Sequence, residues 1–415
     1  MASVTPSPRV LLADCDQMFV AVARLVDPDG AGRAPLLVVG GTATSRGVVC
    51  SASYEVRAFG VRSGMAIAQA ARRCPQAVFV PVPRKACSEK SQEVRSRLDR
   101  WAPLVEAASI DEFYLDLSGT EALYRQEPLA ATAGRIRDDL FVATGLRLSI
   151  GGGTNRLVAK LAAERAKPRP GTAGTGVFVV EPGGEAAFLA THQLAEIPGV
   201  GPRLQAKLRG YGLVSVADTL PVAERDLVGW LGPRTGRWLH ERIRGRSGAG
   251  VEPAGEAKSV SREETFPVDL RGLDRLETEL LRLIARVCED IREDGLVARR
   301  ITVKLRDDDF QTRVASRTLP LPFNADRVAF AAARELLVKL HQRRPRPTRL
   351  LGFGLSHFEV AGAADQLSLL DEPSAALGQT SRDSAVVRAR DEINRRFGQD
   401  AVAPARIAGR RPPSR

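Results

Sequence analysis

Two adjacent carboxylates lie between two apolar segments near residue 110, and this arrangement limits what the chain can fold into. Residues 104–110 and residues 113–117 are short and apolar, so each is predicted to form a strand. Asp111 and Glu112 therefore stand at the junction, where both can project from one edge of a sheet. Like charges so close repel each other unless a cation lies between them. Mg²⁺ is the natural candidate, since it favours carboxylate oxygens; a polar turn without a metal is the alternative.

A third carboxylate follows another predicted strand. Val10–Ala13 is a continuous apolar run, as expected of a strand buried on both faces, and it ends on Asp14. Pairing this strand with the later ones would bring Asp14 beside Asp111 and Glu112. Three carboxylates around two Mg²⁺ ions are what nucleotidyl transfer requires, because one ion activates a hydroxyl and the other holds a triphosphate.

The chain carries an excess of positive charge. Its 415 residues include 61 Lys and Arg against 49 Asp and Glu, a formal net charge of +12. This favours a polyanionic partner, although a basic protein can also be soluble without one. The five cysteines lack CxxC spacing, which argues against a zinc site or disulfide framework and favours a reducing cytoplasm. There is no signal-peptide pattern and no apolar run of the roughly 20 residues that span a bilayer, so we expect a cytoplasmic protein with no membrane partner.

Two stretches rich in Pro and Gly divide the chain. Residues 9–17 and 82–172 are predicted to form one sheet with helices on one face, the α+β pattern of a ferredoxin-like core, and the residues between them are an insertion. Beyond residues 168–174 the composition becomes helical. A further segment follows residues 245–255.

The turn at residues 197–201 resembles a helix-hairpin-helix motif. It precedes a helix predicted over residues 203–210. Gly199 and Gly201 would let the start of that helix present backbone N–H groups to a DNA phosphate. An ordinary helix start is the alternative.

Apolar and basic side chains alternate over residues 299–306, as in a strand with one buried face. The apolar positions are Ile301, Val303 and Leu305. The basic positions are Arg300, Lys304 and Arg306. The basic face suits contact with phosphates of any sequence, and a solvated edge strand protected by charge is the alternative.

Together with further segments, these residues resemble the Y-family DNA polymerases, most closely the DinB or DNA polymerase IV class. The segments appear in the family's order and spacing, and the resemblance extends to about Phe358. The matching segments are Asp14–Phe19, Ser51–Arg57, Phe59–Met65, Ala108–Glu112, Ser149–Gly151, Asn155–Ala163, Ala166–Pro168, Ile197–Gly201 and Lys258–Val260.

The resemblance implies a catalytic centre with two Mg²⁺ ions as cofactor. Asp14, Asp111 and Glu112 correspond to the metal-binding carboxylates, and Glu112 takes the catalytic role. The carbonyl of Cys15 corresponds to an additional ligand.

The resemblance also implies how the nucleotide is held. Phe19 corresponds to a steric gate, whose ring fills the space that a ribose 2′-OH needs. Gln17 and Met18 depart from the family pattern beside this gate, which bears on its stringency. The residues implied to hold the incoming triphosphate are Ser51, Tyr54, Arg57 and Lys160.

The implied fold is a multidomain right hand with a ferredoxin-like palm. The expected parts are a palm (1–17 and 82–172), fingers (18–81), a helical thumb with the helix-hairpin-helix (173–245), a linker (246–257), an α/β little finger (258–360) and a tail (361–415). In the tail, the residues that resemble a sliding-clamp-binding peptide are Gln366, Leu367, Leu369 and Leu370.

The function implied is error-prone translesion DNA synthesis on primer-template DNA from dNTPs, without a proofreading exonuclease and by a monomer. Three alternatives stay open: a catalytically silent homologue that binds DNA and the clamp, a non-enzymatic DNA-binding protein, and a nucleotidyl cyclase. Retention of all three carboxylates argues against the silent homologue, and the little finger and clamp peptide argue against a cyclase.

Overall fold

The computed structural model describes residues 7–168, 174–248, 250–253, 255–361, 378–398 and 401–407. The chain forms two compact units, Met1–Ala43 with Val48–Gly255, and Thr44–Gly47 with Glu256–Arg415. Both combine helices and sheets, which confirms the predicted α+β class. Among the described helices, none is long and apolar enough to cross a membrane.

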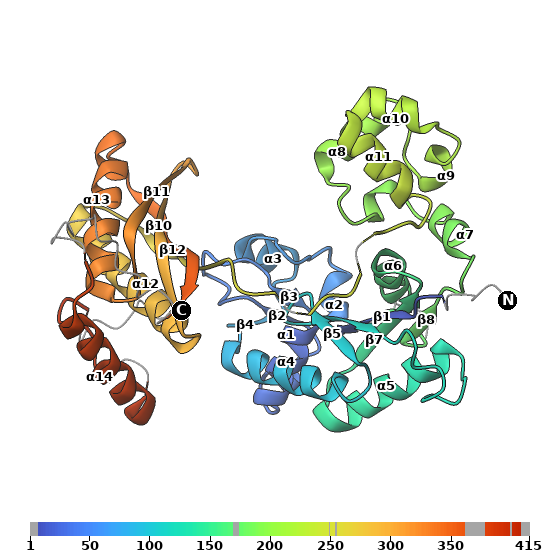
Figure 1. Ribbon diagram of the computed structural model, residues 1–415, viewed down its shortest axis with the longest axis horizontal. Helices are drawn as coiled ribbons and strands as arrows, with labels where there is room; N and C mark the ends of the chain where they lie inside the picture. Colours follow the sequence, from blue (N-terminus) through green and yellow to red (C-terminus); the bar gives the residue numbers. More distant parts are fainter. Residues whose placement is uncertain are drawn as a thin grey trace, which may run out of the picture. The chain divides into compact units, whose positions relative to one another are not determined.

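A five-stranded sheet forms the centre of the first unit (Figure 1). Its central strand pairs antiparallel with both neighbours. In sheet order the strands are β5 (Leu104–Ala107), β6 (Glu112–Asp116), β1 (Val10–Cys15), β7 (Leu148–Gly153) and β8 (Val177–Val179).

Helices cover both faces of this sheet, whereas the sequence predicted helices on one face. Leu11 and Ala13 of β1 pack with α4 (Arg84–Leu98) and α5 (Leu129–Thr144), and Val10 and Leu12 pack with α6 (Arg156–Ala166). Because successive side chains of a strand point to opposite faces, the continuous apolar run of β1 needs cover on both sides.

Two boundaries of the predicted sheet also differ. The strand expected over residues 104–110 ends at Ala107, because the Ser109 hydroxyl accepts hydrogen bonds from the backbone N–H groups of Asp111 and Glu112 and forms a turn. The sheet also continues beyond residue 172, where the palm was expected to end, since β8 pairs in parallel with β7.

Glycines let α6 lie directly against β7. A Cβ added to Gly151 would be 2.0 Å from the backbone nitrogen of Ala163 and 2.2 Å from the carbonyl oxygen of Ala159. Only a residue without a side chain fits so close to a helix backbone. This contact sets the position of α6 and therefore of Lys160, which it carries.

A small three-stranded sheet is inserted after β1 and α1 (Met18–Val26). Here β2 pairs antiparallel with β3 and parallel with β4. The elements of this insertion are η1 (Ala31–Arg33), β2 (Leu37–Val39), β3 (Ser51–Ala52), α2 (Tyr54–Arg57), α3 (Ile67–Arg73) and β4 (Val78–Val80).

Short helices follow β8 and share an apolar core with one side of α6. They are α7 (Glu185–Ala190), η2 (Leu194–Glu196), α8 (Pro202–Arg209), α9 (Val216–Thr219), α10 (Glu224–Leu231) and α11 (Pro233–Arg242).

The second unit is an antiparallel four-stranded sheet with two helices on one face. In sheet order its strands are β11 (Thr312–Phe323), β10 (Leu296–Asp307), β12 (Thr348–Val360) and β9 (Ser259–Leu270). The helices α12 (Leu273–Glu293) and α13 (Asp326–Arg343) pack on Ile301, Val303 and Leu305 of β10, which are all fully buried. The predicted alternation is confirmed.

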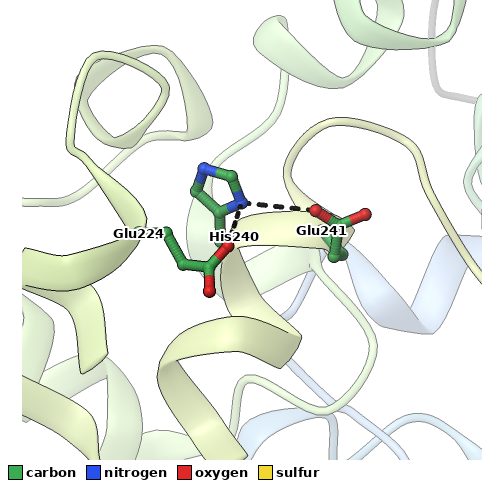
Figure 2. Close-up of side chains that lie close together, drawn as sticks. All are labelled: Glu224, His240 and Glu241. Atoms are coloured by element: carbon green, nitrogen blue, oxygen red, sulfur yellow. Dashed lines mark hydrogen bonds and ion pairs between the residues drawn. The ribbon is translucent and has the colours of Figure 1, made fainter. Parts of the chain in front are cut away.

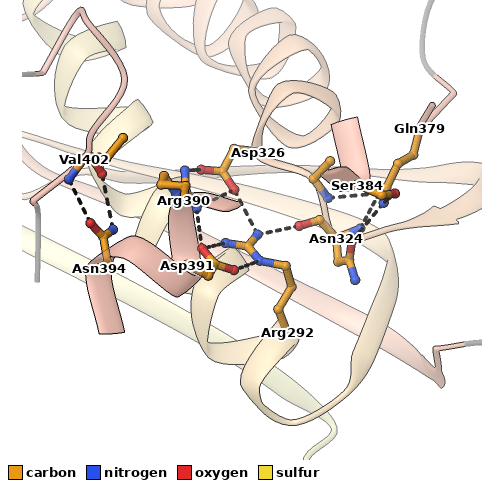
Figure 3. Close-up of polar contacts among 10 residues, drawn as sticks. Arg292, Asn324, Asp326, Gln379, Ser384, Arg390, Asp391, Asn394 and Val402 are labelled. Carbon is orange, nitrogen blue, oxygen red and sulfur yellow. Dashed lines mark hydrogen bonds and ion pairs between the residues drawn. The ribbon is translucent and has the colours of Figure 1, made fainter. Parts of the chain in front are cut away.

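A C-terminal helix, α14 (Ser381–Phe397), is bound to this unit by a buried ionic network (Figure 3). Arg292 of α12 donates to both oxygens of Asp391, at 2.6 and 3.0 Å, and to Asp326 at 3.0 Å. The Arg292 side chain is only 8% exposed. The side-chain oxygen of Gln379 also accepts from the backbone nitrogens of Asn324 and Ala325, at 2.8 and 3.0 Å, just before α13.

We predict that Asp391→Ala lowers the free energy of unfolding of the second unit by about 2–4 kcal/mol, because it leaves Arg292 buried with one partner fewer. Urea denaturation, with hydrogen exchange of the α14 amides, measures the effect. Arg395→Ala is the control, since its ion pair with Glu392 is exposed and contributes little. Unchanged α14 protection in Asp391→Ala would contradict the prediction.

Candidate active site

Strand pairing brings the three predicted carboxylates to one end of the five-stranded sheet. Asp14 lies directly opposite Glu112 in the β1–β6 register. The backbone nitrogen of Cys15 donates to the carbonyl oxygen of Asp111 at 2.9 Å, which fixes the turn between β5 and β6 against the end of β1. Residues about a hundred positions apart in the chain thus meet at one end of the sheet, where the Asp111 carboxylate accepts from the Ser109 hydroxyl at 2.5 Å.

Two lysines contact two of these acids. Lys160 of α6 donates to both carboxylate oxygens of Glu112, at 2.7 Å each. Lys167, which follows α6, lies 2.7 Å from Asp14 and 2.5 Å from Glu164. The sequence prediction gave Lys167 no role, although the Lys167-Pro168 pair was among the matching segments and signalled it.

Asp14 is the most deeply buried of the three acids, at 5% exposure. Burial raises its pKa to about 7, against the opposing effect of Lys167. A buried carboxylate whose negative charge remains unfavourable beside one lysine is a position that a further cation would stabilise.

The donor atoms at this site suit a hard divalent cation. Carboxylate oxygens are the ligands that Mg²⁺ prefers. The Cys15 thiol is 2% exposed, and burial raises its pKa well above the usual value, with nearby carboxylates adding to the rise. The sulfur therefore stays protonated and is a poor ligand, so only the carbonyl of Cys15 fits the predicted role.

Three of the four residues predicted to hold a triphosphate come from β3 and α2. Ser51 is buried in β3. Tyr54 and Arg57 are the first and last residues of α2, and the Arg57 guanidinium carbon lies 4.8 Å from the centre of the Tyr54 ring. The fourth, Lys160, contacts Glu112 rather than these residues.

Asp16 connects α2 to the acidic end of the sheet. Ser149 of β7 donates to its two carboxylate oxygens at 2.9 and 3.1 Å, and the Tyr54 hydroxyl donates at 3.3 Å. The sequence prediction assigned Asp16 no function, although its place two residues after Asp14 was visible.

Phe19 lies in the first turn of α1, partly buried between the core of the five-stranded sheet and the smaller core of β2. The preceding Gln17 has φ 50°, a left-handed conformation that is uncommon for a residue with a side chain. The chain therefore turns sharply between the end of β1 at Cys15 and the start of α1 at Met18.

Of the two glycines in the predicted helix-hairpin-helix, only Gly199 has a backbone conformation and surroundings that require glycine. Gly199 has φ 99°, and a Cβ there would lie 2.7 Å from the Trp238 ring. Gly201 has an ordinary φ of −79° and precedes Pro202, the first residue of α8. Nothing lies within 4 Å of where its Cβ would be, so the backbone is open on that side.

The basic residues of β10 lie on the sheet face opposite α12 and α13. Arg300 is exposed, and Arg306 donates to the hydroxyl of Thr312 at 2.8 Å. Lys304 donates to both carboxylate oxygens of Glu263, at 2.7 and 3.0 Å, so its positive charge is partly offset. The predicted clamp peptide, residues 366–370, lies outside the described residues.

A second cluster of possible metal ligands occurs in the helical part of the first unit (Figure 2). His240 lies 3.7 Å from Glu224 and 3.3 Å from Glu241. Each glutamate already has a cationic neighbour, Arg237 at 3.6 Å and Arg246 at 3.4 Å. Exposed acids paired in this way do not indicate a metal.

Comparison with known proteins gives consistent matches along the chain. Residues 13–164 match the impB/mucB/samB family, and residues 257–369 match the C-terminal domain of that family. A DNA polymerase IV from Caulobacter vibrioides is 34% identical over 393 residues, which are 95% of this chain and 92% of that protein.

Solved structures share the fold. The structure described as "Y-family DNA polymerase chimera Dbh-Dpo4(243-245)-Dbh" aligns with a TM-score of 0.74 at 24% identity, and "Insertion ternary complex of Dbh DNA polymerase" aligns with a TM-score of 0.59 at 25% identity. Each alignment covers 85% of this chain and 99% of the other.

Proposed function

Because the chain belongs to the DNA polymerase IV class of the Y-family DNA polymerases, we propose that Asp14, Asp111 and Glu112 form the centre at which it joins a dNTP to a primer 3′-OH on primer-template DNA. The polymerase acts in translesion synthesis. The observation that carries the site assignment is the strand register, which sets Asp14 opposite Glu112 beside the backbone of Asp111. The silent-homologue alternative is not favoured, since all three acids are retained and brought together.

The proposed cofactor is a pair of Mg²⁺ ions held by these carboxylates and the Cys15 carbonyl. Such ions lower the pKa of an attacking hydroxyl and neutralise the leaving pyrophosphate. The chain's own cations supply the rest of the charge: Lys160 and Lys167 lie against the acids, and Arg57 stands at the end of α2. In this proposal Lys160, Lys167 and Arg57 bind the triphosphate by charge-assisted hydrogen bonds. Ser51 and Tyr54 lie beside it.

In this proposal each structural part corresponds to one part of the right hand. The five-stranded sheet, extended to Val179, is the palm, and the β2–β4 sheet is the fingers. Helices α7 to α11 are the thumb, residues from 246 to 257 are the linker, and the β9–β12 sheet with α12 and α13 is the little finger.

We expect wild-type protein to extend a primer with Mg²⁺ and dNTPs, and Asp111→Asn and Glu112→Gln to lose at least about 10³-fold in rate, because each removes a charge that holds the cations. Gel-based primer extension measures this. Asp116→Asn is the matched control, since Asp116 ends the same strand, β6, four residues beyond Glu112. Mg²⁺ titration calorimetry should show weaker binding in the two site variants alone; full activity in either would overturn the assignment.

The same assay tests Phe19 as the steric gate. Phe19→Ala should raise ribonucleotide incorporation by about 10²-fold or more, because it opens the space beside the sugar C2′. Deoxynucleotide incorporation is the internal control. A variant that still excludes ribonucleotides would remove Phe19 from this role and leave the metal assignment intact.

We further propose that the open backbone at Gly201, the turn at Gly199 and the basic face of β10 contact DNA phosphates. Arg300→Ala and Arg306→Ala should each lower the slope of log affinity against log salt by about 0.9, the value for one phosphate contact. Lys304→Ala should have a smaller effect, because Glu263 already pairs with it. Fluorescence anisotropy across a salt series measures the slopes.

Arg334→Ala is the control for these slopes, since Arg334 lies on α13, on the other side of the sheet, and pairs with Glu277. Equal slopes in all the variants and the wild type would exclude the β10 face as the phosphate contact.

The last part of the proposal is that a monomer docks on a sliding clamp through Gln366, Leu367, Leu369 and Leu370. Apolar side chains of such a peptide fill pockets while the glutamine makes polar contacts. Deletion of residues 366–370 should abolish stimulation by a clamp in primer extension and leave synthesis without the clamp unchanged. Full stimulation of the deletion variant would rule the peptide out.

A further inference from the structure

We propose that Asp16 is a positioning residue, which holds Tyr54, and through it Arg57, in place for the incoming nucleotide. The inference rests on the proposed role of Tyr54 and Arg57 in binding the triphosphate. It gives the Asp16 carboxylate, which lies close in sequence to the proposed metal ligand Asp14, a function separate from metal binding.

The carboxylate of Asp16 is fixed by the five-stranded sheet. Its two oxygens accept from Ser149, which is fully buried in β7, and its backbone nitrogen donates to the carbonyl oxygen of Arg147 at 2.9 Å. Within the described part of the chain, no lysine, arginine or histidine forms an ion pair with Asp16. The hydroxyl donors Ser149 and Tyr54 and the nearby charge of Lys167 stabilise this carboxylate against its burial, and its position is set by the palm.

The hydroxyl of Tyr54 reaches this fixed acceptor at 3.3 Å. Burial raises the pKa of Tyr54 to about 12, and the charge of Asp16 adds to the rise, so the phenol keeps the proton that it donates. The contact joins the palm to the first residue of α2, which belongs to the β2–β4 insertion.

The helix α2 is held by its contacts with the rest of the unit, namely the fully buried Val56 and the Tyr54–Asp16 hydrogen bond. It has four residues, a single turn, and one turn of helix is not stable by itself. Its Tyr54 ring is held at one end by Asp16 and faces the Arg57 guanidinium across 4.8 Å. A cation over an aromatic face is attracted to it, so fixing the ring also restricts the guanidinium.

Arg57 is held on its other side by the backbone. Its Nε donates to the carbonyl oxygen of Ala52 at 3.1 Å. Its two Nη groups form no hydrogen bond or ion pair with any residue that the structure describes. A guanidinium fixed at Nε with both Nη groups available is suited to a bidentate contact with phosphate.

These contacts form a continuous series from Ser149 through Asp16 and Tyr54 to Arg57. The consequence for catalysis is specific. Loss of Asp16 should weaken the binding of the nucleotide by releasing Tyr54 and Arg57, whereas the rate of the chemical step should change little, because Asp14, Asp111 and Glu112 keep their places.

The test is steady-state incorporation of a single dNTP opposite an undamaged template base, with kcat and KM determined separately. Asp16→Ala should raise KM by about 10-fold and change kcat by less than about threefold. Asp16→Asn keeps an oxygen that accepts from Ser149 and Tyr54, so it should recover most of the affinity. Asp29→Ala is the control, because Asp29 is an exposed acid whose ion pair is with Arg33.

A double-variant cycle shows whether Asp16 acts through Tyr54. Tyr54→Phe should raise KM, and adding Asp16→Ala to it should cause little further change, since the contact is already lost. Independent effects that multiply in the double variant would overturn the proposal. Ser149→Ala, which removes the anchor of Asp16 and alters neither proposed phosphate contact, should give a smaller rise in KM and covers the case in which Asp16→Ala does not fold.

The possible failures are distinguishable. A collapse of kcat in Asp16→Ala to the level of Asp14→Asn, without recovery in Asp16→Asn, would make Asp16 a metal ligand and not a positioning residue. Wild-type KM in Asp16→Ala would dismiss the inference while the polymerase stands. If the wild type incorporated nothing, the proposed function would fail, and equilibrium binding of dNTP to the same variants would still report whether Asp16 controls nucleotide affinity.

Discussion

The antiparallel pairing of β1 with β6 is the constraint on which the proposed active site depends. The register places Asp14 opposite Glu112, and the Cys15–Asp111 backbone hydrogen bond closes the end of the pair. Because side chains alternate along a strand, a shift of one residue would turn Asp14 to the other face and dissolve the cluster. The register is protected by the apolar residues of β1, which are buried on both faces of the sheet.

Close packing of α6 on β7 positions two lysines beside these acids. Gly151 lets the helix backbone approach the strand, and the buried alanines of α6 keep the contact tight. Lys160 and Lys167 are thereby held at the same end of the sheet as the acids. The acids and their lysine partners thus come together through one packing arrangement, in which Lys167 offsets only part of the cost of burying Asp14.

Much of the site was predictable from local sequence. Asp14 ends a continuous apolar segment, and Asp111-Glu112 lies between two others, so the ends of three strands could be predicted. The resemblance to a polymerase family then predicted that these acids act together. The alternation around Lys304 was equally local and is confirmed. The helices on both faces of the five-stranded sheet were missed, as was β8, whose three side chains are all partly buried and show no alternation.

The sequence by itself determined the family and the α+β class, and it predicted the three acids of the proposed centre, because these depend on residue types and spacings that are present in the linear chain. Only the tertiary structure decided which cation pairs with which acid, and that the Asp16 carboxylate accepts from Ser149 and Tyr54. Those contacts join residues separated by 38 to 153 positions. They follow from the strand register, the sharp turn at Gln17 and the close approach of α6, none of which any single segment specifies.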